Sequence, residues 1–218
     1  MKKYLFRLGK QAVKAAIETI NSKRKNKVLK DYCNLLKKYK IKIISENKKD
    51  LKLAKQKKLK DNLLNRLLVN EKKILEIIKS INNIIKLKDP VNQTLEKWKR
   101  PNGLKISKVT TSIGVISIIY ESRPNVTSDV ASLCFKSGNP VILKGGSEAY
   151  YTNKILSNLF RKALKKNNIN LNYVQFIDYK NKKVVDFLLT KMSDYIDVII
   201  PRGGKNLVKK VNESSKIP

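Results

Sequence analysis

The sequence predicts an α/β protein in which a helical N-terminal region is followed by an open parallel β-sheet. Two patterns lead to this fold class. Apolar residues recur every three or four positions through residues 1–90, and from residue 113 onward short β-branched runs alternate with helical patterns. Alternation of strand and helix builds right-handed βαβ units, whose strands pair in parallel. The hydrophobic fraction of 41% over 218 residues is sufficient for a buried core.

Residues 1–90 are expected to form amphipathic helices. A short helix is predicted over 61–68, and the lysine-rich stretch 48–60 is expected to be the solvated face of a helix. Asp89-Pro90 closes the region, because the residue before proline disfavours helix. The apolar positions of the three longer helices are Ala12, Val13, Ala16, Ile17 and Ile20; Val28, Leu29, Tyr32, Leu35 and Leu36; and Ile74, Ile77, Ile78, Ile81, Ile84 and Ile85.

Residues 91–112 are expected to form a strand or arm between the helices and the sheet. Gly103 interrupts the chain, and the residues at 104–109 then alternate in the manner of a partly exposed strand. The compact apolar run GVISIIYE at 114–121 has the composition of a strand buried on both faces. We therefore place the start of the sheet domain at residue 113.

Four buried strands are predicted in the domain 113–218, over residues 115–120, 141–144, 173–177 and 196–200. A further helix over 205–212 follows the fourth strand. Because an open α/β sheet normally continues beyond this point, we expect the domain to be incomplete at its C-terminus. The apolar positions of the intervening helices are Val126, Val130, Leu133 and Cys134; Ile155, Leu159 and Leu164; and Val184, Val185, Leu188 and Leu189.

The strongly basic composition has two competing explanations. The chain has 49 Lys+Arg against 17 Asp+Glu, a formal net charge of +32, which is compatible with a nucleic-acid partner. However, only 7 of these residues are arginine, the side chain best suited to bidentate phosphate and base contacts. The lysines are scattered, and Lys, Asn and Ile are all encoded by A/T-rich codons. We therefore favour compositional drift over a nucleic-acid footprint.

Several site classes are excluded by composition. The chain contains no histidine and two cysteines, which excludes His-based catalytic triads, His-ligated zinc and four-cysteine metal sites, so no metal is predicted. No run of about 18 apolar residues is present, and the N-terminus lacks the apolar segment of a signal peptide. We expect a cytoplasmic protein with no membrane partner.

Three predicted strand ends carry the residues that could bind a ligand, because ligands of open α/β sheets bind at the carboxyl ends of the strands. Two of these ends are Gly-Gly turns that lead into helices and carry a cation, where backbone N–H groups favour anions. The sequence therefore predicts a site for a phosphorylated ligand, although it contains neither GxGxxG nor a P-loop. The three ends are Glu121-Ser122-Arg123-Pro124-Asn125, Lys144-Gly145-Gly146-Ser147 and Pro201-Arg202-Gly203-Gly204.

These segments also carry a family resemblance. The runs GVISIIYESRPNVTSDVASLCFKSGNPVILKGGSEA and YIDVIIPRGG closely resemble γ-glutamyl phosphate reductase, the glutamate-5-semialdehyde dehydrogenase of proline biosynthesis, in the aldehyde dehydrogenase superfamily. The similarity runs from the N-terminal helices to Pro218, and YESRPNVT and IPRGG are its most specific motifs. The resemblance covers the N-terminal half of such an enzyme and implies a Rossmann-like NADP-binding domain of the aldehyde dehydrogenase type.

The resemblance implies an oxidoreductase that uses NADPH to reduce L-glutamate 5-phosphate to L-glutamate 5-semialdehyde and phosphate. In this family a cysteine thiolate displaces phosphate, an oxyanion hole stabilises the tetrahedral intermediates, and hydride reduces the thioacyl group. By resemblance, Asn125 contributes its side-chain amide to the oxyanion hole, and its alternative role is a helix N-cap. Arg123 would meet the phosphate or carboxylate of the substrate, or form a structural salt bridge.

Five further residues would hold the cofactor by resemblance. Lys144 matches the basic residue that contacts the adenosine ribose or its phosphate, and the alternative is one more lysine of the compositional drift. Ser147 and Glu148 match neighbours of that ribose, and a Ser-Glu pair is equally a good helix start. Gly203 and Gly204 match the turn that approaches the pyrophosphate, and their alternative is a tight turn without a ligand.

The sequence departs from the family in length. Family enzymes are about twice as long, and their nucleophilic cysteine lies in the second half, so the catalytic cysteine domain is expected to be absent here. Cys134 shares a predicted helix face with apolar residues, and Cys33 lies in an apolar helix. Both are therefore interpreted as buried structural thiols rather than nucleophiles.

Three hypotheses follow. The first is that the chain is the NADPH-binding part of a γ-glutamyl phosphate reductase. The full-length enzyme would form a homo-oligomer, and its C-terminal half could be encoded separately. The second is a truncated, inactive remnant that persists as a binding module. The third is a basic nucleic-acid-binding protein, which would show steeply salt-dependent binding. The scattered lysines and the βαβ pattern count against the third hypothesis.

Overall fold

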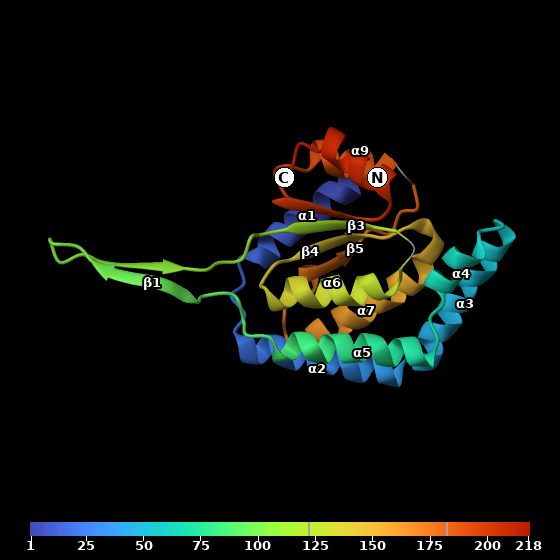
Figure 1. Ribbon diagram of the computed structural model, residues 1–218, viewed down its shortest axis with the longest axis horizontal. Helices are drawn as coiled ribbons and strands as arrows, with labels where there is room; N and C mark the ends of the chain where they lie inside the picture. Colours follow the sequence, from blue (N-terminus) through green and yellow to red (C-terminus); the bar gives the residue numbers. More distant parts are fainter. Residues whose placement is uncertain (122, 182) are drawn as a thin grey trace.

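The computed structural model describes residues 1–121, 123–181 and 183–218, and it has the predicted α/β architecture. A parallel sheet lies between two helical layers (Figure 1). One face is covered by α1 (Lys2–Ala16), α8 (Lys183–Lys191) and α9 (Lys205–Ser214). The other face is covered by α6 (Asn125–Lys136) and α7 (Tyr150–Lys166), and beyond them lie α2 (Ser22–Lys38) and α5 (Glu71–Lys86).

The sheet has the strand order β5-β4-β3-β6, with every neighbouring pair parallel. The chain passes from β3 (Ile116–Tyr120) outward to β4 (Val141–Lys144) and β5 (Val174–Phe176), and then returns to the other side of β3 as β6 (Val198–Arg202). The direction of winding therefore reverses between β3 and β6. Such a switch point leaves a crevice at the carboxyl ends of the two strands, and this is where open α/β sheets bind ligands.

The central strand β3 is buried on both faces, as its continuous apolar sequence predicted. Ile116, Ile118 and Tyr120 pack in the core formed with α2, α5, α6 and α7. Val115 and Ile119 point the opposite way, into the core formed with α1 and α8. The strand therefore contributes apolar side chains to both hydrophobic cores.

Most of the predicted elements are confirmed, but several details are wrong. The third predicted strand runs over Val174–Phe176 and not over 173–177, and Val13, predicted on the buried face of the first helix, is 39% exposed. Strand 141–144 is found with the predicted bounds, whereas β6 starts at Val198 and not at residue 196. In α1 the buried face is formed by Leu5, Leu8, Ala12 and Ala15, while Ile17 lies beyond the helix and is 79% exposed. In α6 Leu133 is 47% exposed, because it lies in line with Asn125 and Asp129 on the solvent side of the helix. None of the described helices combines the length and the apolar character needed to cross a membrane.

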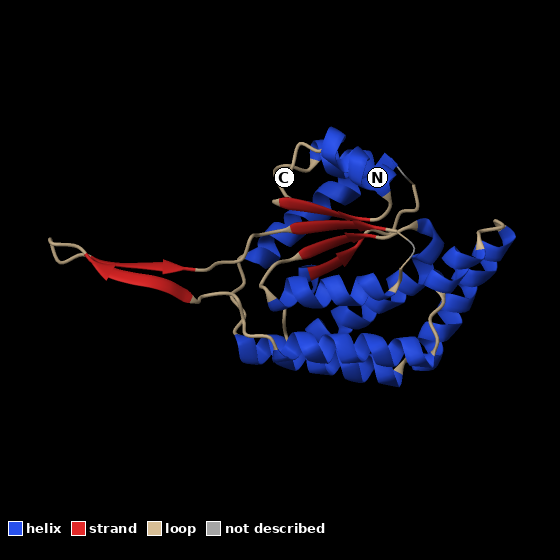
Figure 2. Ribbon diagram, in the orientation of Figure 1, coloured by secondary structure: helices blue, strands red, loops and turns tan. Residues whose placement is uncertain are grey.

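An antiparallel hairpin projects from the body of the molecule (Figures 1 and 2). It consists of β1 (Thr94–Lys99) and β2 (Lys105–Val109), which pair through residues such as Trp98 and Ile106. The sequence predicted the second of these strands and missed the first. Every residue of β1 is exposed, so the strand has no buried face that would produce an alternating pattern.

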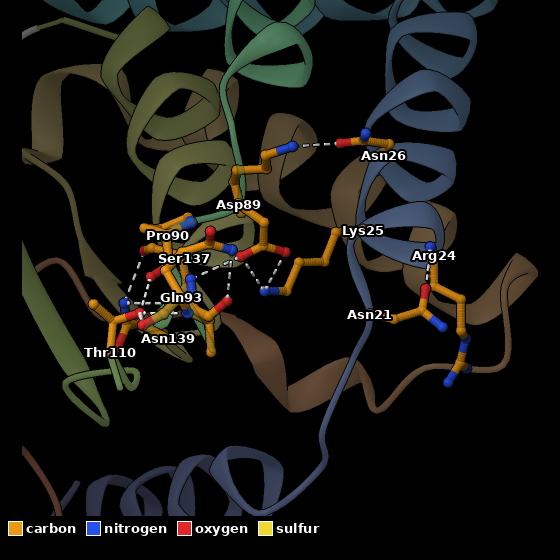
Figure 3. A network of polar contacts seen from close by, with 12 residues as sticks. Asn21, Arg24, Lys25, Asn26, Asp89, Pro90, Gln93, Thr110, Ser137 and Asn139 are labelled. Atoms are coloured by element: carbon orange, nitrogen blue, oxygen red, sulfur yellow. Dashed lines mark hydrogen bonds and ion pairs between the residues drawn. The ribbon is translucent and has the colours of Figure 1, made fainter. Parts of the chain in front are cut away.

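A polar network fixes the base of this hairpin to the helices (Figure 3). Lys25 of α2 pairs with Asp89 at 3.0 Å, and both side chains are largely buried. Asn139, which follows α6, accepts hydrogen bonds from the N–H groups of Ile113 and Gly114 at 2.7 and 3.0 Å. Gly138, next to Asn139, lies close to the Lys25 ammonium, so both ends of the hairpin are anchored at the same place on the helical layer.

A second buried network joins α3 (Lys40–Gln56) to the start of α7. Asp50 accepts hydrogen bonds from the backbone N–H groups of Tyr151 and Thr152 and from the Thr152 hydroxyl, at 3.0, 2.8 and 2.6 Å. Asn47 donates to the Leu67 carbonyl at 2.8 Å, at the end of α4 (Asp61–Leu67). Asp50 thus satisfies backbone donors that the first turn of α7 leaves free, and it does so from another helix.

We expect Asp50→Ala to destabilise the protein by about 2–4 kcal/mol, because it leaves buried backbone donors without an acceptor. Urea unfolding at equilibrium measures this difference. Asp194→Ala, at an exposed turn, is the matched control and should change the stability by no more than about 0.5 kcal/mol. Equal effects of the two substitutions would contradict the capping role of Asp50.

Candidate functional site

The carboxyl ends of β3, β4 and β6 form two neighbouring clefts with Glu121 between them. Glu121 directly follows β3 and contributes to the walls of both. Helices α3 and α4 lie at this end of the sheet (Figure 1). The structure therefore brings together the three strand ends that the sequence singled out, but it divides them into two compartments.

The first compartment, which we call the arginine cleft, has a volume of about 310 Å³. Three arginines from different elements reach it, Arg66 from α4, Arg123 after β3 and Arg202 at the end of β6. Three guanidinium groups against one carboxylate make this cleft suitable for an anion. Its walls are Leu63, Arg66, Glu121, Arg123, Val126, Arg202, Gly203 and Gly204.

The second compartment, which we call the lysine cleft, has a volume of about 520 Å³. Its polar walls include Lys144, Lys180 and Lys210, and its apolar walls include Val185 and Leu207. An apolar floor beside several cations fits a ligand with a flat ring and a phosphate group. The turn that follows β4 completes the wall with Gly145, Gly146, Ser147 and Glu148.

Lys144 is the most deeply placed cation of the lysine cleft. The side chain is buried, and its ammonium donates a hydrogen bond to the Gly145 carbonyl at 2.8 Å. Burial lowers the pKa of Lys144, while the carboxylate of Glu148 opposes that shift. A partly desolvated cation of this kind gains from an anionic ligand that replaces lost hydration.

The Gly-Gly turn after β4 is packed too closely for a side chain. A β-carbon on Gly145 would clash with Nδ2 of the buried Asn153 and crowd the Tyr120 ring, so this position favours glycine. Asn153 belongs to a buried chain of hydrogen bonds in which Tyr120 contacts the Thr127 hydroxyl at 2.7 Å and Thr127 donates to Asn153 Oδ1 at 2.9 Å. Within the described residues, Nδ2 of Asn153 has no acceptor. These hydrogen bonds hold the Asn153 side chain against the backbone of Gly145.

Ser147 and Glu148 lie where the sequence placed them, at the start of a helical segment. They form a 3₁₀ turn, Ser147–Ala149, that leads into α7. The Ser147 hydroxyl donates to the Glu148 carboxylate at 3.0 Å. Both residues line the lysine cleft, and Asp50, not Ser147 or Glu148, accepts the hydrogen bonds of the first backbone N–H groups of α7.

Asn125 is the first residue of α6, and Pro124 occupies the N-cap position, so the alternative of an Asn125 N-cap is wrong. The Asn125 amide donates to the Asp129 carboxylate at 3.1 Å. Its neighbours Arg123 and Val126 line the arginine cleft. Ser122, in the same strand end, lies outside the described residues.

Several charged residues of the site, among them Arg66 and Glu121, were assigned no role from the sequence. Arg66 belongs to the N-terminal helices and reaches the arginine cleft only because α4 packs at the ends of the strands. Glu121 was recognised as part of a strand end, but no role was assigned to it. No local pattern could have revealed either, since both depend on contacts between distant segments.

Comparison with known proteins agrees with the observed fold. No family model matches the chain. The γ-glutamyl phosphate reductase of Nautilia profundicola is 46% identical over 201 residues, which cover 92% of this chain and 48% of that protein. The crystal structure of γ-glutamyl phosphate reductase from Thermotoga maritima superimposes with a TM-score of 0.95 at 36% identity, over 98% of this chain and 52% of that one.

The chain is similar to about half of a γ-glutamyl phosphate reductase.

The wider fold is that of the aldehyde dehydrogenases. A probable aldehyde dehydrogenase from Listeria monocytogenes matches with a TM-score of 0.73 at 17% identity, over 99% of this chain and 45% of that one. The chain spans about half the length of the curated reductases that it matches. The resemblance inferred from YESRPNVT and IPRGG is thus confirmed.

Neither cysteine has the surroundings of a reductase nucleophile. Cys33 and Cys134 are both buried in the larger core. Burial raises the pKa of Cys33 to about 11 and that of Cys134 to about 12. A reactive thiol is normally partly exposed and has a lowered pKa, so both cysteines are structural.

We expect both thiols to resist alkylation in the folded protein. Unfolded cysteines have a pKa of about 8.5, so iodoacetamide at pH 8.5 should label the denatured chain quickly and the native chain hardly at all. The raised pKa values also mean that the folded state keeps protons that the unfolded state loses, so stability should fall as the pH rises above about 8.5. Intact-mass analysis follows the labelling, and rapid native labelling of Cys134 would contradict a structural role.

Proposed function

We propose that this chain forms the nicotinamide dinucleotide-binding part of a γ-glutamyl phosphate reductase. The observation that carries the proposal is the position of the lysine and arginine clefts on either side of the switch point between β3 and β6. A dinucleotide is an elongated ligand with an adenosine end and a reactive end. Two adjoining basic clefts match that shape better than one deep pocket would.

The residues of the lysine cleft fit the adenosine end of NADPH. The buried Lys144 would contact the ribose or its phosphate, with Ser147 and Glu148 beside the same ribose. Gly203 and Gly204, where α9 begins, would approach the pyrophosphate with their backbone N–H groups. When bound, NADPH would supply the hydride for the reduction.

The arginine cleft would receive the substrate, L-glutamate 5-phosphate. Arg123, Arg66 and Arg202 can pair with its phosphate and carboxylate groups, which would hold and orient the substrate. The Asn125 amide, one position before Val126 of the cleft wall, would donate a hydrogen bond to the developing oxyanion. The Asn125 amide has two N–H donors, so it can keep its bond to Asp129 and donate the second N–H to the oxyanion.

The products would be L-glutamate 5-semialdehyde and phosphate, in proline biosynthesis. We place the nucleophilic cysteine outside residues 1–218, because Cys33 and Cys134 are buried with raised pKa values. A complete active site therefore needs a further segment, supplied by the same polypeptide or by a second one. The projecting β1–β2 hairpin would serve as the arm of a homo-oligomer of the cytoplasmic enzyme.

We expect the folded chain to bind NADP⁺, and Lys144→Met to weaken that binding about tenfold, since a charge-assisted contact to phosphate is lost. Isothermal titration calorimetry measures both affinities. Lys209→Met is the matched control, because Lys209 lies on the nearby helix α9 with its side chain exposed. This substitution should change the affinity by no more than about twofold, because the long-range attraction of an exposed lysine is screened by salt.

Two outcomes would contradict the proposal. One is a folded chain that shows no NADP⁺ binding. The other is an equal loss of affinity in the Lys144 and Lys209 variants, which would indicate attraction by the overall positive charge alone.

A further inference from the structure

The carboxylate of Glu121 lies in the turn between β6 and α9. Its Oε2 accepts a hydrogen bond from the Gly204 N–H at 2.9 Å. A β-carbon on Gly203 would lie 2.6 Å from Cδ and 2.7 Å from Oε2 of the same side chain. Glu121 therefore fills the space beside Gly203 and contacts the N-cap of α9.

This turn is a favourable place for an anion. The ten residues of α9 direct their dipole and their free N–H groups toward it, and Gly204 has no side chain that could cap them. The backbone of Glu121 is fixed here by pairing of Tyr120 with Arg202 and by the bond from Glu121 N–H to the Arg202 carbonyl at 3.3 Å. The protein thus supplies its own negative charge at the start of α9.

The position of Glu121 also divides the site. The residue belongs to the walls of both the arginine cleft and the lysine cleft. A ligand that extends from one cleft to the other has to pass the carboxylate. Because Glu121 is exposed, its side chain can turn into solvent without leaving a buried charge behind.

We propose that Glu121 is an internal anion that occupies the pyrophosphate position and is displaced when a dinucleotide binds. This inference rests on the proposed function, and it adds a residue that sets the affinity for the cofactor. Two anions cannot share the turn without strong repulsion, so pyrophosphate and carboxylate compete for the same N–H groups. The apparent affinity is then reduced by the fraction of molecules in which Glu121 occupies the turn.

The competition predicts selectivity among ligands. NADP⁺ contains the pyrophosphate and has to displace Glu121. Adenosine 2′-monophosphate carries the ribose and its 2′-phosphate but no pyrophosphate, so it can occupy the lysine cleft while Glu121 stays in place. Removal of the charge of Glu121 should therefore strengthen the binding of the first ligand and leave the second unchanged.

The test compares the wild-type chain with Glu121→Gln by isothermal titration calorimetry. We expect NADP⁺ to bind the variant about tenfold more tightly and adenosine 2′-monophosphate to bind both proteins within about twofold. Glu213→Gln, which removes the same charge near the other end of α9, is the matched control and should change neither affinity. Thermal unfolding adds a second readout, since Glu121→Gln should lower the melting temperature of the free chain but increase the stabilisation by NADP⁺.

Unchanged or weaker NADP⁺ binding in folded Glu121→Gln, with measurable binding in the wild type, would overturn the inference and leave the proposed function intact. Tighter binding of both ligands would also overturn it, because the effect would then not depend on the pyrophosphate. A wild-type chain without NADP⁺ affinity would overturn the proposed function and this inference together. If Glu121→Gln does not fold, Glu121→Ala is expected to give the same selective gain.

Discussion

The burial of β3 on both faces is the constraint on which the rest of the structure depends. A strand with no solvated face needs neighbours on both edges and helices above and below, so its connections have to cross over the sheet. The chain meets this requirement by winding first toward β5 and then back to β6. The reversal places the ends of β3 and β6 side by side, which is why Glu121 and the Gly203-Gly204 turn meet.

The N-terminal helices take part in the site although they are remote from it in sequence. Asn47 and Asp50 of α3 bind the end of α4 and the start of α7, so the loop after β4 and the helix that carries Arg66 are held by one buried network. The polar chain of Tyr120, Thr127 and Asn153 supports the same loop from beneath. The buried networks that stabilise these helices therefore also hold residues that form the walls of the two clefts.

Much of the fold could be predicted from the sequence, because burial leaves a local pattern of apolar residues. Strand 141–144 was found from a continuous apolar run, and the isoleucine-rich helix α5 from its helical period. The strand β1 was missed and Ile17 was wrongly placed on a buried face, because neither packs against the core. Lys144 and the glycine turns were identified from strand ends, whereas Arg66 and the contact between Glu121 and Gly204 arise only from packing of distant segments.

The central claim is that a dinucleotide binds across the ends of β3, β4 and β6. A two-dimensional NMR titration of the labelled chain with NADP⁺ tests it most directly, because glycine amides report local contacts. The largest shifts are predicted at Gly145, Gly146, Gly203 and Gly204. The hairpin lies away from the site and should show little change. Shifts spread over the surface lysines of α3 and the hairpin, and lost on addition of salt, would contradict the claim.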